Sequence, residues 1–179
     1  MPPKKTVSPP PPAAEPVPPK PTGSAKARRS AARLAAVQAL YQIELGGTPS
    51  ETAIGEFVRH RLGQEIDGDH YVSADPQLFA DIVRGVTARQ ADADQLISGV
   101  LDRQWGLDRM EPILRAILRA GAWELLGNTG VAPHIVINDY IDVGHAFFAG
   151  REPGMVNGVL DRIARQLRPE EMAARETRR

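Results

Sequence analysis

Apolar residues recur at helical spacing along almost the whole chain after Ser24, and this pattern is the strongest constraint on the fold. Residues 154–163 show it most clearly, because Val156, Leu160 and Ile163 would lie on one stripe of a helix that faces a core. The longest β-branched run contains a proline and continues at helical spacing, which argues against a strand. The sequence therefore predicts an all-α protein.

Cap and turn residues divide this pattern into about seven helices. Ser24 can cap the first helix, and Gly46 with Gly47 can end it. The polar residues 63–73 are expected to form a loop. The predicted helices cover residues 24–45, 51–62, 76–86, 91–105, 112–126, 133–148 and 154–168.

Asn157 and Gly158 interrupt the middle of the last predicted helix. Glycine at such a position costs about 1 kcal/mol relative to alanine. We therefore expect a neighbouring helix to approach closely at this point.

The N-terminal segment differs in composition from the helical region. Ten of the sixteen prolines lie in residues 1–22, together with lysines and almost no large apolar side chains. Such a segment cannot bury enough apolar surface to offset the entropy that it would lose on ordering. The sequence predicts a disordered proline-rich arm over 1–25, a helical domain over 26–168 and a flexible charged tail over 169–179.

The charged residues are balanced in number but unevenly placed. The chain has 22 basic and 22 acidic residues, yet residues 1–29 hold six of the basic ones and a single glutamate. Residues 30–164 hold eleven basic residues against eighteen acidic ones. Basic ends on an acidic body indicate a polyanion or an acidic partner at the ends; a purely solubilising role of these ends is the alternative.

The sequence lacks the patterns that most enzymes and metalloproteins need. There is no cysteine, the four histidines lack metal-ligand spacing, and neither a phosphate-binding loop nor a G-x-S-x-G motif occurs. No apolar run is long enough to cross a membrane, and the N-terminus has no signal-peptide core. We therefore expect a cytoplasmic protein without catalytic activity, cofactor, metal or membrane contact.

The start of the first predicted helix is the main candidate for a binding site. Lys26, Arg28, Arg29 and Arg33 lie within eight residues there, directly after the cationic arm. Arginine forks onto phosphates and stacks on bases, so this segment suits a nucleic-acid backbone. For Arg33 the alternative is an ion pair with an acidic residue of the last helix. Tyr41, two turns further on, could stack an unpaired base, and a place in the core is its alternative.

A second patch is expected at the junction of the last two predicted helices, at Phe147, Phe148, Arg151 and Met155. Two adjacent aromatic residues on a helix are 100° apart, so both cannot point inward. One of them is a candidate surface platform, and a loop packed over it is the alternative.

Three blocks of the sequence resemble the NusB family of bacterial transcription antitermination factors. The first is RRSAAR at 28–33 followed by AVQALYQIEL at 36–45. The second is ILRAGAWELL at 117–126, and the third extends from APHIVINDYIDVGHAFF through VNGVLDRIA, at 132–164. The blocks occur in the order of the family, and the resemblance spans roughly residues 28–168.

The resemblance implies an all-helical fold of two small bundles without catalytic activity. Members of the family bind the boxA element of nascent single-stranded RNA as a heterodimer with NusE, a small-subunit ribosomal protein. They act in the antitermination complex of RNA polymerase, notably on ribosomal RNA operons, and some self-associate, so a homodimer is a further state that the resemblance allows. Position by position, the resemblance places RNA contacts on Arg28, Arg29, Ser30, Arg33, Tyr41, Phe147, Arg151 and Met155.

The chain departs from the family pattern in both contact regions. Ser30 and the alanine after it stand where the family often has further arginines, and residues 150–154 read GREPG where acidic residues and lysine are common. For the NusE surface we expect an acidic helix face near Asp108, Glu111 and Glu124.

Two other functions remain open at this point. The helical domain also resembles the N-terminal part of some ribosomal RNA cytosine methyltransferases, where it precedes a cofactor-binding α/β domain for which we expect these 179 residues to leave no room. The third hypothesis is a protein-interaction module whose basic arm only aids solubility. An RNA gel shift with and without the ribosomal protein distinguishes these functions.

Overall fold

The computed structural model describes residues 20–62, 72–102 and 104–177, and within them every regular element is a helix. This confirms the predicted all-α fold. The helices are α1 (Ala25–Gly46), α2 (Ser50–His60), α3 (Pro76–Ala88), α4 (Gln90–Val100), the short 3-10 helix η1 (Leu107–Arg109), α5 (Pro112–Gly127), α6 (Pro133–Phe147), α7 (Glu152–Leu167) and α8 (Pro169–Glu176).

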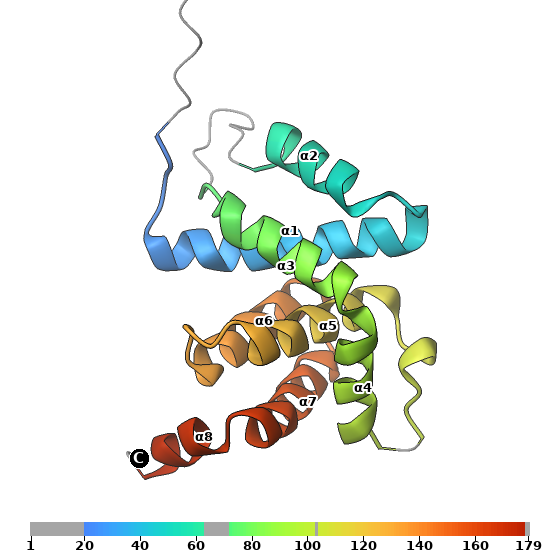
Figure 1. Cartoon of the computed structure of the whole chain (residues 1–179), viewed down its shortest axis with the longest axis vertical. Coiled ribbons are helices and arrows are strands. Elements are labelled where there is room, and N and C mark those ends of the chain that lie inside the picture. Colours follow the sequence, from blue (N-terminus) through green and yellow to red (C-terminus); the bar gives the residue numbers. More distant parts are fainter. Residues whose placement is uncertain (1–19, 63–71, 103, 178–179) are drawn as a thin grey trace, which may run out of the picture.

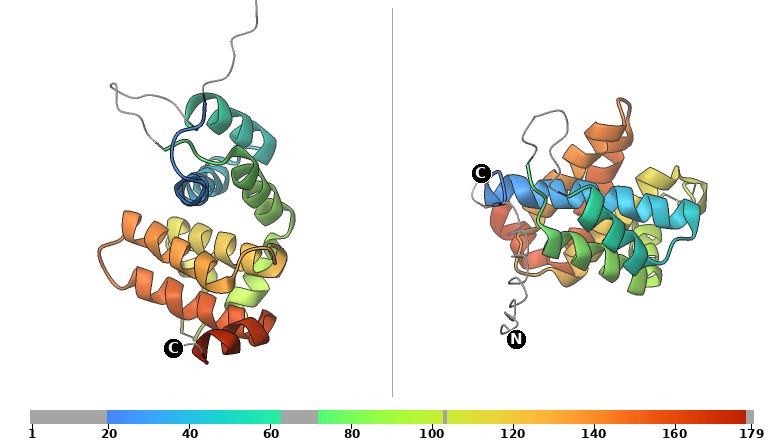
Figure 2. Two further views of the ribbon diagram at one scale, coloured as in Figure 1. Left: turned by 90° about the vertical axis from the view of Figure 1, so that its left-hand side faces the viewer. Right: turned by 90° about the horizontal axis from the view of Figure 1, so that it is seen from above.

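The helices form two bundles that share α1 as their boundary. Helices α1, α2 and α3 pack on one another in the upper bundle, and α4 to α7 pack together in the lower one (Figure 1). Seen end on, α1 lies between α2 and α3 on one side and the lower bundle on the other (Figure 2). Because α1 also packs on α5 and α6, it belongs to both cores.

Local sequence signals set the ends of these helices as predicted. The Ser24 hydroxyl caps α1 by accepting a hydrogen bond from the Ala27 N–H at 3.1 Å. At the other end Gly47 adopts φ +64°, the left-handed conformation that glycine takes without steric cost. Asp75 caps α3 by accepting from two backbone N–H groups, with Pro76 in the first turn.

The predicted apolar stripe of α7 faces the core, because Val156, Leu160 and Ile163 have no exposed surface. The expectation for Gly158 is wrong: a Cβ added there would meet no atom within 4 Å. The close approach lies instead at Gly121 of α5, where a Cβ would come within 2.6 Å of the Leu160 side chain.

The structure differs from the predicted boundaries at two places. Helix α4 ends at Val100, five residues before the predicted end, and the Trp105 N–H donates to the Asp102 carbonyl beyond it. Residues 169–176, expected as a flexible tail, form α8, which contacts α6 and α7 and buries Met172.

Only part of the expected disordered arm can be compared with the structure, since residues 1–19 lie outside the described chain, as do 63–71 of the expected loop. Residues 20–24 are placed. The Thr22 N–H donates to the Ser73 hydroxyl at 3.1 Å, and the Ser73 N–H donates to the Thr22 carbonyl, also at 3.1 Å. This pair of bonds fastens the start of α1 to the segment before α3.

Candidate nucleic-acid interface

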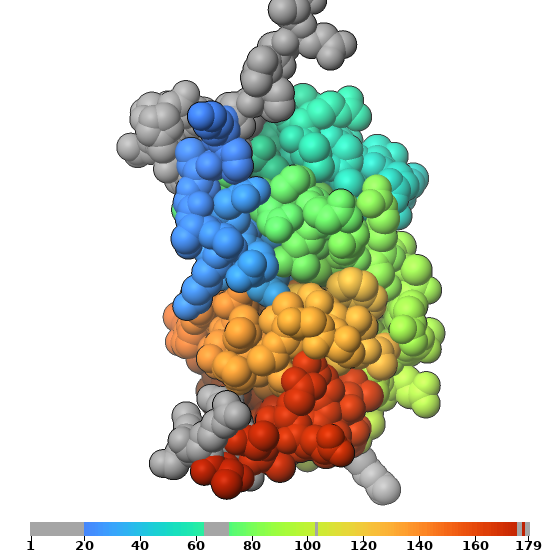
Figure 3. Space-filling view, turned by 60° about the vertical axis from the view of Figure 1, so that its left-hand side comes forward, coloured from blue at the N-terminus to red at the C-terminus, as the bar shows by residue number. Residues whose placement is uncertain are grey.

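The predicted basic cluster lies in the first turns of α1. Lys26 and Arg29 are exposed, whereas Arg28 is half-buried and donates from Nε to the Ser73 carbonyl at 3.3 Å. In the space-filling view α1 extends along one face of the molecule, with α3 beside it and the lower bundle below (Figure 3). Arg29 is therefore available to a ligand, and Arg28 offers the part of its guanidinium that Ser73 does not engage.

Arg33 does not belong to this surface, and the prediction that it contacts RNA is wrong. Its side chain is 1% exposed, because α1 packs on α5 and α6 at this point. The guanidinium donates two hydrogen bonds to Glu124, at 2.8 and 2.9 Å, and a third to Asp139 at 2.7 Å. The alternative of an internal ion pair is confirmed, but the partners come from α5 and α6 and not from the last helix.

Other polar groups complete the coordination of these two carboxylates. Tyr140 and Asn128 donate to Glu124 at 2.7 and 3.1 Å, and Ser30 donates to Asp139 at 3.0 Å. Ser30, a predicted RNA contact, is thus half-buried and already bonded. Its hydroxyl is bound to the Asp139 carboxylate, so only part of the Ser30 side chain is left for a ligand.

The network changes the pKa values of its members. Burial lowers the pKa of Arg33, but the hydrogen bond and the charge of Glu124 outweigh it, so the net pKa is raised above its ordinary value. For Tyr140, burial and then the negative charge of Glu124 raise the pKa of the hydroxyl well above its ordinary value. Arg33 is therefore a permanent buried cation and Tyr140 a neutral donor.

An open pocket of about 730 Å³ lies at the other end of α1. It brings together two predicted residues, Tyr41 from α1 and Phe147 from the end of α6, each 38% exposed. Tyr41 is thus a surface residue, contrary to its alternative as a core residue. Phe148 packs against the core and Phe147 is exposed, so Phe147 stays the candidate surface platform. We call this cavity the aromatic pocket.

Arg151 and Met155 lie on the wall of a second pocket, of about 540 Å³. Its other walls come from Trp105 and Arg109, on either side of the start of η1, and from Glu111 before α5. Glu111 lines both pockets, so they are neighbours. We call this cavity the Trp105 pocket.

Two lining residues were missed by the sequence reasoning. Arg61, at the end of α2, lines the aromatic pocket, and its guanidinium lies 4.7 Å from the centre of the Phe57 ring. Apolar spacing predicts that Trp105 ends the helix 91–105, yet Trp105 lies outside α4 and is 47% exposed. Nothing in the local sequence identifies Arg61, because only the packing of α2 on α1 brings it near Tyr41.

The predicted acidic face is only partly present. Asp108 and Glu111 are exposed, but Glu124 has no exposed surface, since it is the main partner of Arg33. A protein partner could therefore meet the first two carboxylates and not the third.

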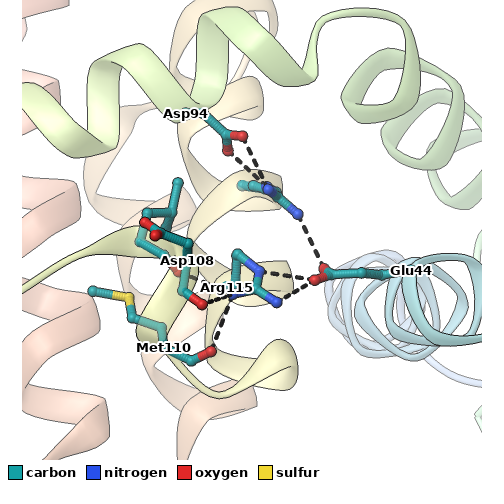
Figure 4. Close-up of polar contacts among 7 residues, drawn as sticks. Glu44, Asp94, Asp108, Met110 and Arg115 are labelled. Carbon is teal, nitrogen blue, oxygen red and sulfur yellow. Dashed lines mark hydrogen bonds and ion pairs between the residues drawn. The ribbon is translucent and has the colours of Figure 1, made fainter.

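A second ion-pair network joins α1 to the lower bundle at the far end of α5. Glu44 of α1 receives hydrogen bonds from Arg115 and from Arg119, and Arg119 also donates to Asp94 of α4 (Figure 4). Arg115 also donates to the carbonyls of Leu107 and Met110, at 2.9 and 3.1 Å (Figure 4). This arginine thus fixes the position of η1 at the edge of the Trp105 pocket.

Two further properties of the described residues bear on the kind of site. They contain no group of three or more His, Cys, Asp or Glu placed to hold a metal ion. Across the same residues, the helices all fall short of the length or the apolar character needed to span a bilayer.

Fold and surface define a class of protein: an all-helical, two-bundle protein with basic residues at one end of its boundary helix and an aromatic pocket at the other. Residues 30–165 match the NusB family. The chain is 49% identical over 156 residues to the transcription antitermination protein NusB of Rhodopseudomonas palustris, which covers 87% of this chain and 92% of the relative. The NusB of Nitrobacter hamburgensis is 51% identical over 82% of this chain and 91% of its own length. The chain belongs to the NusB family.

Solved structures agree with this assignment. T. maritima NusB superposes with a TM-score of 0.65 at 27% identity, covering 81% of this chain and 96% of that one. A chain from a crystal structure of the antitermination factors NusB and NusE in complex with dsRNA has the same fold, with a TM-score of 0.65 at 24% identity over 78% of this chain and 97% of that one.

Proposed function

We propose that this protein is a non-catalytic transcription antitermination factor that binds single-stranded boxA-type RNA together with NusE, within the antitermination complex of RNA polymerase on ribosomal RNA operons. The names of its relatives support the antitermination role. The observation that carries the RNA site is the arrangement of α1, with exposed cations at its start and Tyr41 in the aromatic pocket at its end.

The chemistry of these two ends suits a single strand. Arg28 and Arg29 can neutralise phosphates, while Tyr41 and Phe147 present ring faces on which unpaired bases stack. The acidic body favours contact at these two ends of α1, because like charges elsewhere repel a polyanion. The exposed Asp108, which lines neither of the two pockets, lies where a basic ribosomal protein could dock.

The double variant Arg28→Ala/Arg29→Ala tests the RNA site. We expect weaker binding of a boxA-type RNA and a salt dependence that is flatter by about 0.7 in log–log slope for each lost phosphate contact. Filter binding at four salt concentrations measures both quantities. Arg84→Ala/Arg89→Ala is the matched control, because it removes the same charge from exposed ion pairs on α3 and at its end.

Equal slopes for the two double variants would remove Arg28 and Arg29 from the RNA site.

The partner is tested by gel shifts of the wild-type protein with and without purified NusE. Synergy between NusE and RNA is the expected result; independent binding of the two would contradict the proposed joint complex.

A further inference from the structure

Trp105 is a large aromatic residue held at the surface by its own backbone. It lies between α4 and η1, where its N–H donates to the Asp102 carbonyl at 2.8 Å and closes a turn. The side chain is 47% exposed, whereas Trp123, the other tryptophan, is half-buried. An exposed indole on the wall of a pocket is typical of a contact surface, because a partner that covers the ring removes a large apolar area from water.

The side chains around this indole favour a nucleotide. Arg109 and Arg151 are exposed and line the same pocket, and within the described chain no ion pair is recorded for either guanidinium. Glu111 and Glu152 add two carboxylates, which disfavour a phosphate inside the cavity. A neutral base can enter such a pocket and stack on the indole, while its phosphate stays near the arginines at the surface.

The pocket is also built before any ligand arrives. Arg115 holds the carbonyls of Leu107 and Met110, so η1 and Arg109 keep their place relative to Trp105 (Figure 4). A preformed site loses less conformational entropy on binding than a mobile one.

The Trp105 pocket continues the surface proposed for RNA. It shares Glu111 with the aromatic pocket, and two residues of its wall, Arg151 and Met155, follow Phe147 closely along the chain. An RNA strand with one base in the aromatic pocket therefore passes Glu111 to reach Trp105. This continuity favours the same RNA, and not a separate protein, as the occupant.

We propose that the Trp105 pocket binds one further unpaired nucleotide of the RNA held at the aromatic pocket, with its base stacked on Trp105 and its phosphate beside Arg109 and Arg151. The inference rests on the proposed RNA-binding function. It adds a stacking position, supplied by the segment between α4 and η1, to the contacts that the family resemblance implies.

Trp105→Ala, Trp105→Phe and the control Ile135→Ala test this site. Ile135 is 42% exposed in the first turn of α6, at the opposite end of that helix from Phe147. With a boxA-type RNA extended by several nucleotides at each end, Trp105→Ala should raise the Kd roughly 5- to 150-fold, the range for one lost base stack. Trp105→Phe, which keeps a ring, and Ile135→Ala should stay within a few-fold of wild type.

Fluorescence supplies a second readout that does not depend on affinity. Saturating RNA should quench the wild-type emission, and Trp105→Phe, which keeps only Trp123, should lose most of that quenching. Thermal unfolding is followed by circular dichroism for each variant. A curve that matches the wild-type curve shows that the fold is intact.

The outcomes separate the two proposals. If the wild-type protein binds the RNA but Trp105→Ala binds it equally well and wild-type quenching is unchanged in Trp105→Phe, the Trp105 site is wrong while the proposed function stands. If Trp105→Ala weakens binding of NusE and not of RNA, the pocket is a protein-docking site and the inference is overturned. If the wild-type protein binds no RNA with or without NusE, the proposed function fails and this inference fails with it.

Discussion

The guanidinium of Arg33 is held in the interior by carboxylates from two helices of the lower bundle. Its five N–H groups match this task, because three of them donate to Glu124 and Asp139 in the fork geometry that lysine cannot reproduce. One arginine faces two carboxylates, so Tyr140, Asn128 and Ser30 supply the remaining donors. Removal of the arginine would leave two buried acidic groups without a counter-charge.

We expect Arg33→Met to lower the free energy of unfolding by about 3–5 kcal/mol, the typical cost of breaking a buried ion pair. Urea unfolding followed by circular dichroism measures this loss. The triple variant Arg33→Met/Glu124→Gln/Asp139→Asn is the matched control and should recover part of the stability, since it removes the unpaired charges as well. A loss below about 1 kcal/mol for Arg33→Met would contradict the account of the network.

Residue types and spacing predicted which aromatic residues are exposed, but they could not distinguish exposed arginines from buried ones. Tyr41 and Phe147 are exposed and meet in one pocket, although they are more than a hundred residues apart in sequence. Arg33 has the same chemistry as Arg29, and only the acidic residues of α5 and α6 decide that it is buried. Such partners cannot be read from a single sequence, because they are brought together by tertiary packing.

At the scale of elements, α3 lies against α5 through a glycine. A Cβ added to Gly85 would come within 2.0 Å of the Trp123 ring, so the indole lies directly over the backbone of α3. Only a residue without a side chain allows this approach. The contact joins the upper bundle to the lower one, which gives Gly85 a structural role that its place in a helix does not suggest.

We expect Gly85→Ala to destabilise the protein by about 1–3 kcal/mol, because the added methyl group must displace Trp123. Gly99→Ala is the matched control: a Cβ on Gly99 of α4 meets nothing within 4 Å, so this change should be neutral or stabilising by up to about 1 kcal/mol. Thermal unfolding of both variants compares them. Equal changes in the melting temperature for the two variants would contradict the clash at Gly85.

Helices with a continuous apolar stripe were predicted well, and the others were not. For each of α1 to α7, the apolar spacing predicts a helix that overlaps the observed one. The sequence does not predict α8, because half of its residues are charged and it has no apolar stripe. Its packing depends on the burial of Met172 and on Arg168, which donates to the carbonyls of Val131 and Thr129. Helix α4 was predicted too long, since apolar spacing alone does not show that the chain turns after Val100.

At the scale of the whole molecule, two ion-pair networks of opposite polarity join the bundles. Arg33 near the start of α1 pairs with Glu124 near the end of α5, and Glu44 near the end of α1 pairs with Arg115 and Arg119 in the first half of α5. The order of charges fits only an antiparallel arrangement of the two helices. In a parallel arrangement, like charges would face each other.

The raised pKa of Tyr140 predicts how the stability of the whole molecule depends on pH. Above pH about 10 an unfolded chain releases the phenolic proton, whereas the folded protein retains it. The unfolded state then binds fewer protons, so the free energy of unfolding falls as the pH rises, by up to about 1.4 kcal/mol per pH unit. Below pH about 10 this contribution is constant.

Urea unfolding of wild type and Tyr140→Phe between pH 8 and 11 measures this contribution. The difference in stability between the two should shrink as the pH rises above about 10, because the variant has no proton to release at this position. Tyr41→Phe, which removes an exposed hydroxyl, is the control and should follow the wild-type curve. Parallel curves for wild type and Tyr140→Phe across the whole range would contradict the prediction.

Helix α1 is joined to α5 by ion pairs at two points, at Arg33 in its first half and at Glu44 near its end. Arg28 and Tyr41 are thirteen residues apart on one continuous helix, which corresponds to roughly 20 Å along its axis. The helix itself fixes this separation, because its ends approach each other only if its backbone hydrogen bonds break. The RNA contacts proposed at Arg28 and at Tyr41 therefore require a strand that spans at least this distance.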